Sequence, residues 1–295
     1  MITVFGSTNL DQVGTVSRLP KPGETVAGGT FSMAAGGKGA NQALAARRAG
    51  AQVRHISAVG ADAFADLALE LLKADGVDLS ALKKVDEPTG IAMIFVDQAG
   101  ENCIAVLPGA NGTMTPRDAE QALAGAEGGV LLLQQEIPQA ATERALDLAK
   151  TRGMISILNT APFLDTTSAI APNASILISN ETEFELLSGR AIAELDDAMV
   201  EWSARHGQTV IVTLGKDGAK AALDGRLIAV PALKVTPVDT VGAGDTFCGY
   251  LAAGLDAGLE LEAAMSRAAV AASLACLKPG AQPAIPNAAE VVAAG

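Results

Sequence analysis

Short apolar runs alternate with helical patterns through most of this sequence, and that alternation limits the possible folds more than any other feature. From position 116 onward, mainly apolar runs are separated by stretches in which apolar residues recur at helical spacing; the runs are 130–133, 155–158, 175–179 and 209–214. Continuous apolar runs are typical of strands buried on both faces, and parallel strands need crossover helices between them. The pattern therefore predicts an α/β fold with a mostly parallel central sheet flanked by helices.

Two segments in the first third of the chain depart from this pattern. After a buried strand at 2–6, the residues at about 10–35 combine Thr, Val and Gly with proline turns, and the residues at 89–107 form a hairpin pattern around a turn at 97–100. Further strands are predicted at 53–59 and 226–230, with helices at 62–74, 196–205 and 261–277. We expect a single domain, 1–295, that carries the two insertions as a small separate sheet.

A glycine-rich turn precedes a helical pattern at Gly242-Ala243-Gly244-Asp245-Thr246-Phe247. The first N–H groups of a helix have no partner within it, and glycines allow an anion to approach them closely. A bound phosphate would repel Asp245, unless that carboxylate has a task such as accepting the proton of an attacking hydroxyl. On local sequence alone, an acidic residue that simply favours the helix N-terminus explains the motif equally well.

A second glycine-rich turn, Gly36-Gly37-Lys38-Gly39-Ala40-Asn41, precedes an alanine-rich helix predicted at 42–48. The spacing excludes a P-loop, because Ser or Thr does not follow Lys38. It also excludes a dinucleotide fingerprint, because Gln42 stands where the third glycine should be. Asn41 could cap the helix or bind a ligand.

These two motifs, together with Asn180-Glu181-Thr182-Glu183, resemble the ribokinase (phosphofructokinase-B) family of sugar and nucleoside kinases. The motifs occur in the order of that family, and the resemblance extends over residues 4–286. It implies a three-layer ribokinase-like fold with a mostly parallel sheet, in which the inserted β-sheet forms a lid over the sugar. It also implies a homodimer that pairs through two such lids.

The resemblance implies a role for individual residues. Asp245 would be the general base, and the N–H groups of Gly242, Ala243 and Gly244 would form an anion hole. Besides Asp245, the substrate-binding residues would be Asn9, Asp11, Gly36, Gly37, Lys38, Asn41 and Glu136. The nucleotide would be bound by Asn180, Thr213, Gly215, Gly218, Gly244 and Ala269.

The resemblance also implies two metal ions besides ATP. Mg²⁺ would be held through water by Glu183, and K⁺ by residues of two loops, Asp239, Val241, Lys278 and Gly280. Ala284 departs from the family, where the corresponding position is usually polar, and alanine has no side-chain oxygen to offer K⁺.

Local sequence offers a simpler explanation for several of these residues. Asn180 and Glu183 have the spacing of a capping box, and Glu136 suits the first turn of a helix. An aspartate in a loop, such as Asp11, is usually solvated, and residues 213–218 suit a hairpin turn.

Charge and composition exclude other classes of protein. The net charge of −12 argues against a nucleic-acid partner, which would need a basic surface. No apolar run has the length of a membrane span, and the first residues lack the pattern of a signal peptide, so we expect no membrane partner and a cytoplasmic protein. The three cysteines are scattered and are expected to be free thiols.

The resemblance implies an ATP-dependent sugar kinase that phosphorylates the 5-hydroxyl of D-ribose. Other kinases of the same family, acting on a nucleoside, fructose or a keto-sugar acid, are the nearest alternatives. The aromatic content of 3% disfavours a nucleoside, because few side chains could stack on a base. Two more distant alternatives are a dinucleotide-dependent oxidoreductase, whose fingerprint would need Gly or Ala at Phe247, and a non-catalytic sugar-binding protein.

Overall fold

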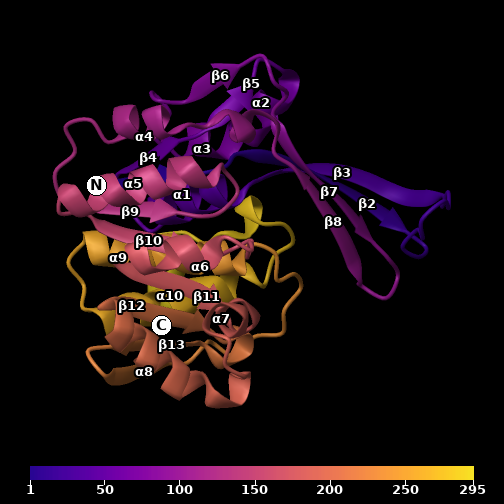
Figure 1. The fold of residues 1–295 in the computed structure, drawn as a ribbon. Coiled ribbons are helices and arrows are strands. Elements are labelled where there is room, and N and C mark those ends of the chain that lie inside the picture. The colour runs from indigo at the N-terminus through magenta and orange to yellow at the C-terminus, as the bar shows by residue number, and fades with distance from the viewer.

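A computed structural model describes residues 1–295, and its centre is an eight-stranded sheet (Figure 1). The strand order is β14-β13-β12-β11-β10-β9-β1-β4. Neighbouring strands from β12 to β4 pair parallel, whereas β13 pairs antiparallel with both β12 and β14. The strands are β1 (Ile2–Phe5), β4 (Val53–Ile56), β9 (Val130–Leu133), β10 (Ile155–Asn159), β11 (Ile176–Asn180), β12 (Thr209–Thr213), β13 (Ala219–Leu223) and β14 (Arg226–Val230). The predicted mostly parallel sheet is confirmed.

Helices cover both faces of this sheet and make a three-layer α/β/α structure. Alternate residues of each strand enter different cores; Ile2 and Val4 face one, and Phe5 faces the other. The first core is covered by α1 (Lys38–Arg48), α2 (Ala63–Ala68), α3 (Glu70–Ala74), α9 (Ala243–Asp256), α10 (Leu261–Ala275) and α11 (Ala288–Ala294). The second is covered by α4 (Pro116–Ala122), α5 (Gln139–Thr151), α6 (Thr167–Ile170), α7 (Glu181–Ser188) and α8 (Leu195–His206).

A close contact between α1 and α9 depends on Gly249. A Cβ built on this residue would lie 2.5 Å from the Gln42 carbonyl oxygen and 2.5 Å from the Ala45 Cβ. Real Cβ atoms do not approach other atoms so closely, so only glycine fits here. The alanine-rich sequence of α1 and the glycine in α9 therefore bring the two helix N-termini, and the residues they carry, to one place.

A second sheet projects from the body of the molecule (Figure 1). Its order is β3-β2-β7-β8, formed by β2 (Asn9–Val16), β3 (Gly28–Gly36), β7 (Gly90–Val96) and β8 (Asn102–Leu107). Strand β2 pairs antiparallel with β3, and β7 pairs antiparallel with β8 as the hairpin pattern predicts; the parallel pairing of β2 with β7 joins the two insertions. A third, two-stranded sheet joins β5 (Ala58–Gly60) to β6 (Lys83–Val85).

Three predicted elements differ from the structure by an internal break or by more than two residues at one end. The strand predicted at 53–59 is two strands, β4 and β5, which belong to different sheets; the break falls at Ser57, whose hydroxyl accepts a hydrogen bond from Thr8. The helix predicted at 62–74 is interrupted at Leu69 and forms α2 and α3. Helix α1 begins at Lys38 rather than 42, because Gly37, with φ of 88°, already makes the turn.

The three cysteines, at 103, 248 and 276, are free, as the sequence predicts. None of the helices has both the length and the apolar character that crossing a bilayer requires.

Candidate functional site

The candidate site lies at the carboxyl ends of β1 and β9, neighbouring strands from which the chain continues in opposite directions across the sheet. Such a switch point leaves a crevice outside the strand ends, where ligands of α/β proteins bind. Ser7 follows β1, and its Oγ donates to Glu136 Oε2 over 2.5 Å. The backbone N–H of Lys38 donates to the same carboxylate oxygen over 2.9 Å. Glu136 thus joins the end of β9 to the start of α1.

Asp245 lies in the first turn of α9, with 6% of its surface exposed. Two amide side chains of α1 hold its carboxylate: Asn41 Nδ2 donates to Oδ2 and Gln42 Nε2 to Oδ1, each over 2.9 Å. The α1–α9 contact therefore places the second glycine motif beside the first. Asn41 and Asp245, which are 204 positions apart in sequence, are in direct contact.

The turn before α9 leaves open space beside free N–H groups. Gly242 has φ of 76°, which the left-handed region allows for glycine. The amides of Gly244 and Asp245 have no backbone acceptor, whereas Ala243 N–H donates to the Thr240 carbonyl over 3.3 Å. A Cβ built on Gly244 would meet no atom within 4 Å. An anion can therefore approach this helix N-terminus.

Asp11 of β2 belongs to the same cluster of charges. Its pKa is raised to about 7 by burial first, then by the negative charges of Glu136 and Asp245, with Lys38 acting in the opposite direction. Its carboxylate lies over Gly36, where an added Cβ would be 2.3 Å from Asp11 Oδ2. The pKa of the Lys38 amine is raised, chiefly by Asp245. Asn9 lies nearby on the same strand, and its Oδ1 accepts from Asn111 Nδ2 over 2.7 Å.

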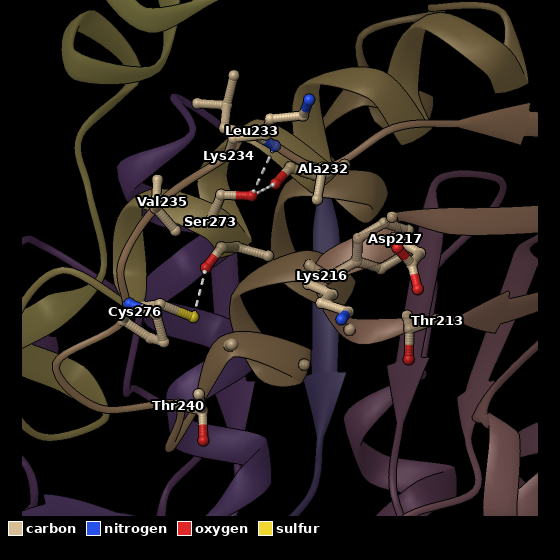
Figure 2. A pocket seen from close by; sticks show the side chains of 18 residues that line it. Thr213, Lys216, Asp217, Ala232, Leu233, Lys234, Val235, Thr240, Ser273 and Cys276 are labelled. Carbon is tan, nitrogen blue, oxygen red and sulfur yellow. Dashed lines mark hydrogen bonds between the residues drawn. The ribbon is translucent and has the colours of Figure 1, made fainter.

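A cavity of about 610 Å³ opens on the other side of the α9 N-terminus (Figure 2). Thr213, Lys216 and Asp217 form one wall, and Ser273 and Cys276 of the α10 end form another (Figure 2). Its lining includes five of the six predicted nucleotide residues, Thr213, Gly215, Gly218, Gly244 and Ala269. Because Gly244 lines this cavity and Asp245 contacts Asn41, Asp245 stands between the cavity and the residues predicted to bind the sugar.

The sixth predicted nucleotide residue, Asn180, caps α7 instead of lining this cavity. Its Oδ1 accepts from Glu183 N over 2.8 Å, and Glu183 Oε2 accepts from Asn180 N over 3.1 Å, so the capping box is present. Glu183 Oε2 also accepts from Thr160 Oγ1 over 2.9 Å. No three His, Cys, Asp or Glu side chains come together in a group that could hold a metal ion.

The predicted potassium residues lie in two adjoining loops. Both oxygens of Asp239 accept backbone hydrogen bonds, from Val241 N over 3.0 Å and from Gly280 N over 2.8 Å. The Lys278 amine points to Glu290. Asp239 therefore ties the loop before α9 to the loop after α10.

Comparisons with known proteins identify the family and agree with the fold described above. The sequence profile of the family described as "pfkB family carbohydrate kinase" matches residues 1–288. A ribokinase of Staphylococcus aureus is 38% identical, covering 98% of both chains, and a deoxyribokinase of Salmonella typhi is 33% identical, covering 97% of this chain and 95% of that protein. The structure of Arabidopsis thaliana ribokinase complexed with ribose and ATP aligns with a TM-score of 0.90 and 32% identity, over 99% of this chain and 97% of that one.

The chain belongs to the pfkB family of carbohydrate kinases. It is therefore an ATP-dependent sugar phosphotransferase with the predicted three-layer fold. The alternative of a dinucleotide-dependent oxidoreductase is wrong.

Sequence reasoning missed several residues of this kinase site. Gln42, Gln134 and Asn159 form a buried amide network behind Asp245, and residues 232–235 line the cavity without any motif. Gln134 and Asn159 each stand at the carboxyl end of a buried strand, and Gln42 is polar within an apolar helix. A search for polar residues at those places could have found all three.

The raised pKa of Asp11 predicts a pH-dependent cost in stability. The carboxyl keeps its proton to about pH 7 in the folded chain but only to about 3.8 in the unfolded chain, so the cost grows as pH rises through that window. We expect Asp11→Asn to stabilise the ligand-free protein by about 2 to 3 kcal/mol more at pH 8 than at pH 5. Urea unfolding at the two pH values measures this difference. Asp165→Asn, at an exposed aspartate, is the control, and equal stabilisation by Asp11→Asn at both values would contradict the prediction.

Proposed function

We propose that this kinase transfers the γ-phosphoryl group of ATP to the 5-hydroxyl of D-ribose, with Asp245 as general base. The observation that carries the proposal is the position of Asp245, held by α1 residues on one side and adjoining the cavity at the α9 N-terminus on the other. A hydroxyl on the Asn41 side and a phosphoryl group on the Gly244 side would meet at this carboxylate.

The proposed chemistry relies on positioning and electrostatics. Phosphoryl transfer passes through a transition state with charge spread over the moving group. The N–H groups of Gly242, Ala243 and Gly244 would stabilise that charge. The N–H group of Gly244 has no acceptor within the backbone, and neither has that of the next residue, Asp245. Asp245 would accept the hydroxyl proton as the new bond forms.

A small polyhydroxylated substrate fits the residues on the sugar side. Asn9, Asp11, Asn41 and Glu136 offer amide and carboxylate groups around the glycines at 36 and 37, whose missing Cβ atoms allow the Asp11 carboxylate and the Asn9 backbone to approach closely. Asn41 Oδ1 is buried and has no partner, so it could accept a sugar hydroxyl. The Asp11 carboxylate has no hydrogen bond within the protein and is available to the hydroxyl groups of a ligand. The relative named deoxyribokinase makes 2-deoxy-D-ribose the nearest competing substrate.

ATP would occupy the cavity of about 610 Å³, against Thr213, Gly215, Gly218 and Ala269, with Asn180 near its phosphates. Glu183 fits an indirect role toward Mg²⁺, because its Oε1 has no hydrogen bond within the protein and no second acidic ligand lies close enough to complete a metal site. Mg²⁺ usually keeps several waters and takes phosphate oxygens as ligands. When bound, the ion would neutralise phosphate charge.

The loops joined by Asp239 fit a monovalent cation less directly. The Asp239 oxygens already accept from Val241 and Gly280, so K⁺ would depend largely on backbone carbonyls, with Lys278 contributing its carbonyl rather than its amine. Ala284 is fully buried and offers no side-chain oxygen. We propose K⁺ activation as a secondary feature of the same enzyme.

A substrate panel tests the proposal. We expect ADP release to have its highest kcat/KM with D-ribose, compared with 2-deoxy-D-ribose, fructose, a nucleoside and a keto-sugar acid. Each assay contains Mg²⁺ and is run in KCl and in NaCl, and K⁺ should raise the rate. A higher kcat/KM for any of the other substrates would overturn the assignment of D-ribose.

Two substitutions separate the proposed roles of the carboxylates. Asp245→Asn should lower kcat by about three orders of magnitude or more while ATP affinity changes within a few-fold, because only the proton acceptor is lost. Asp11→Ala should mainly raise the KM for the sugar. Asp256→Asn, near the other end of α9, is the matched control and should keep full turnover. Near-normal kcat in Asp245→Asn would exclude that residue as the base.

We also propose that residues 1–295 form a single kinase domain, whose four-stranded sheet acts as a lid over the sugar and pairs two chains. Strand register places Phe31 and Met33 of β3 on the same face as Met93 and Phe95 of β7, opposite to the face that carries Asp11. All four side chains are exposed. Exposed apolar patches of this kind mark interaction surfaces, and a second copy of the sheet could cover this one face to face.

Sedimentation analysis tests the dimer. We expect the wild-type chain to sediment as a dimer and the double variant Phe31→Glu/Phe95→Glu as a monomer, because two buried charges would face each other across the interface. Leu186→Glu changes an exposed leucine of α7 that lies outside the lid, and it should remain dimeric. A wild-type monomer, or a dimeric double variant, would contradict the proposal.

A further inference from the structure

We infer that Gln42 is a positioning residue for the base: it holds the Asp245 carboxylate in one orientation, and Gln134 holds Gln42 in turn. This inference rests on the proposed role of Asp245. It adds two residues that lie behind the carboxylate rather than on the predicted sugar side.

Hydrogen bonds in the network fix the direction of the Gln42 amide. Gln42 Nε2 donates to Asp245 Oδ1 over 2.9 Å and to Asn159 Oδ1 over 3.2 Å. Asn159 must present its oxygen to Gln42, because its own Nδ2 donates to the Ile178 carbonyl over 3.2 Å. An ionised carboxylate and a carbonyl can only accept, so both ends of this chain require Gln42 to be the donor.

Gln134 completes the arrangement from the opposite side. Its Nε2 donates to Gln42 Oε1 over 2.7 Å, so every polar atom of the Gln42 side chain is paired. Gln42 and Gln134 are both fully buried. Rotation of the Gln42 amide would put its oxygen against the Asp245 carboxylate and its nitrogen against the Gln134 nitrogen, losing all three hydrogen bonds. The base therefore faces an amide with one allowed orientation.

Two glycines leave the room that this network needs. A Cβ built on Gly6, at the end of β1, would lie 2.0 Å from Gln134 Oε1. Gly249 allows the backbone of α1 at Gln42 to approach α9. The carboxyl ends of β9 and β10 supply Gln134 and Asn159, so the network is anchored in the rigid centre of the sheet.

Gln42 differs from Asn41 in what else it can contact. Asn41 has an unpaired buried oxygen that is available to a ligand, whereas Gln42 has none, so Gln42 can act on the reaction only through Asp245. The charged and titratable groups around Asp245 are Lys38 of α1, Asp11 of β2, Glu136 after β9, Glu183 of α7 and Cys248 of α9. Replacing the neutral Gln42 leaves all of these in place. A change in the pH dependence can then be ascribed to the lost N–H donor.

The test compares Gln42→Met with the wild-type chain. It measures the rate of the phosphoryl-transfer step in single turnovers, with the sugar that gives the highest activity. We expect this rate to fall about 10- to 100-fold, with the KM values for sugar and ATP within about 3-fold. The acidic limb of the rate profile should move to higher pH by about one unit, because losing a donor disfavours the ionised carboxylate. Gln208→Met is the matched control. Gln208 is a buried glutamine that donates to the Ala171 and Ala174 carbonyls, and its loss should lower the melting temperature without moving the profile.

Gln134→Met provides a second, independent arm. It leaves the Gln42–Asp245 contact in place but removes the donor to Gln42 Oε1, so the Gln42 side chain is held less firmly, and we expect a smaller rate loss and a shift in the same direction. In the double variant Gln42→Met/Gln134→Met, the losses should not add, because Gln134 acts through Gln42. Additive losses, or a fall in rate with an unmoved pH profile, would show a merely structural role and overturn the inference.

Failure of this inference can be told from failure of the proposed function. If Asp245→Asn abolishes turnover while Gln42→Met keeps the wild-type rate and profile, Asp245 remains the base and the role of Gln42 is wrong. If Asp245→Asn retains turnover, the base is misassigned and the inference about Gln42 fails with it. If Gln42→Met does not fold, the rate and pH profile of Gln134→Met test the role of Gln42 instead: an unmoved profile would overturn the inference.

Discussion

The contact between α1 and α9 is the constraint on which the rest of the site depends. The two helices begin at glycine-rich turns more than 200 positions apart in sequence, and Gly249 allows their backbones to meet. That approach brings the amides of Asn41 and Gln42 within hydrogen-bonding distance of Asp245. One carboxylate consequently adjoins both the residues predicted to bind the sugar and the cavity of about 610 Å³. If a methyl group at position 249 moved the two helices apart, the buried Asp245 carboxylate would lose its donors, and an unpaired buried charge costs free energy of folding.

Three carboxylates and one lysine share this buried space, and the protein treats the carboxylates differently. Glu136 accepts from Ser7 and from the backbone at Lys38, and Asp245 accepts from two amides. Asp11 has no donor within the protein, and its pKa is raised to about 7 as a result of burial and neighbouring charge. A carboxylate left without donors is ready for hydroxyl groups from a ligand. Such a site lowers stability in exchange for binding, a common conflict at functional positions.

The sequence was sufficient for the fold class and for the family but not for the contacts that complete the site. Apolar runs such as 130–133 could be predicted as strands, because a strand buried on both faces of a parallel sheet needs apolar residues at every position, and this is visible in the local sequence. The run at 53–59 misled because its break falls at Ser57, which contacts Thr8 far away in sequence, and local composition does not show such a contact. The pairing of Gln42 with Gln134 and Asn159 depends likewise on three separate strand and helix ends meeting in space. The roles of the individual site residues, including Asp245, stay predictions.

The negative net charge of this kinase and its use of ATP are compatible because the attraction for phosphate is local. Interactions between exposed charges fade within about 8 Å at physiological salt, so the overall charge of −12 acts weakly inside a cavity. Within the site, Lys38 lies close to Asp245, and Lys216 and Lys234 line the cavity. The free N–H groups at the start of α9 add a positive electrostatic potential. This potential comes from the backbone, so it does not change with pH. A few fixed donors in a buried place can therefore attract a phosphate group without the basic surface that a nucleic-acid-binding protein needs.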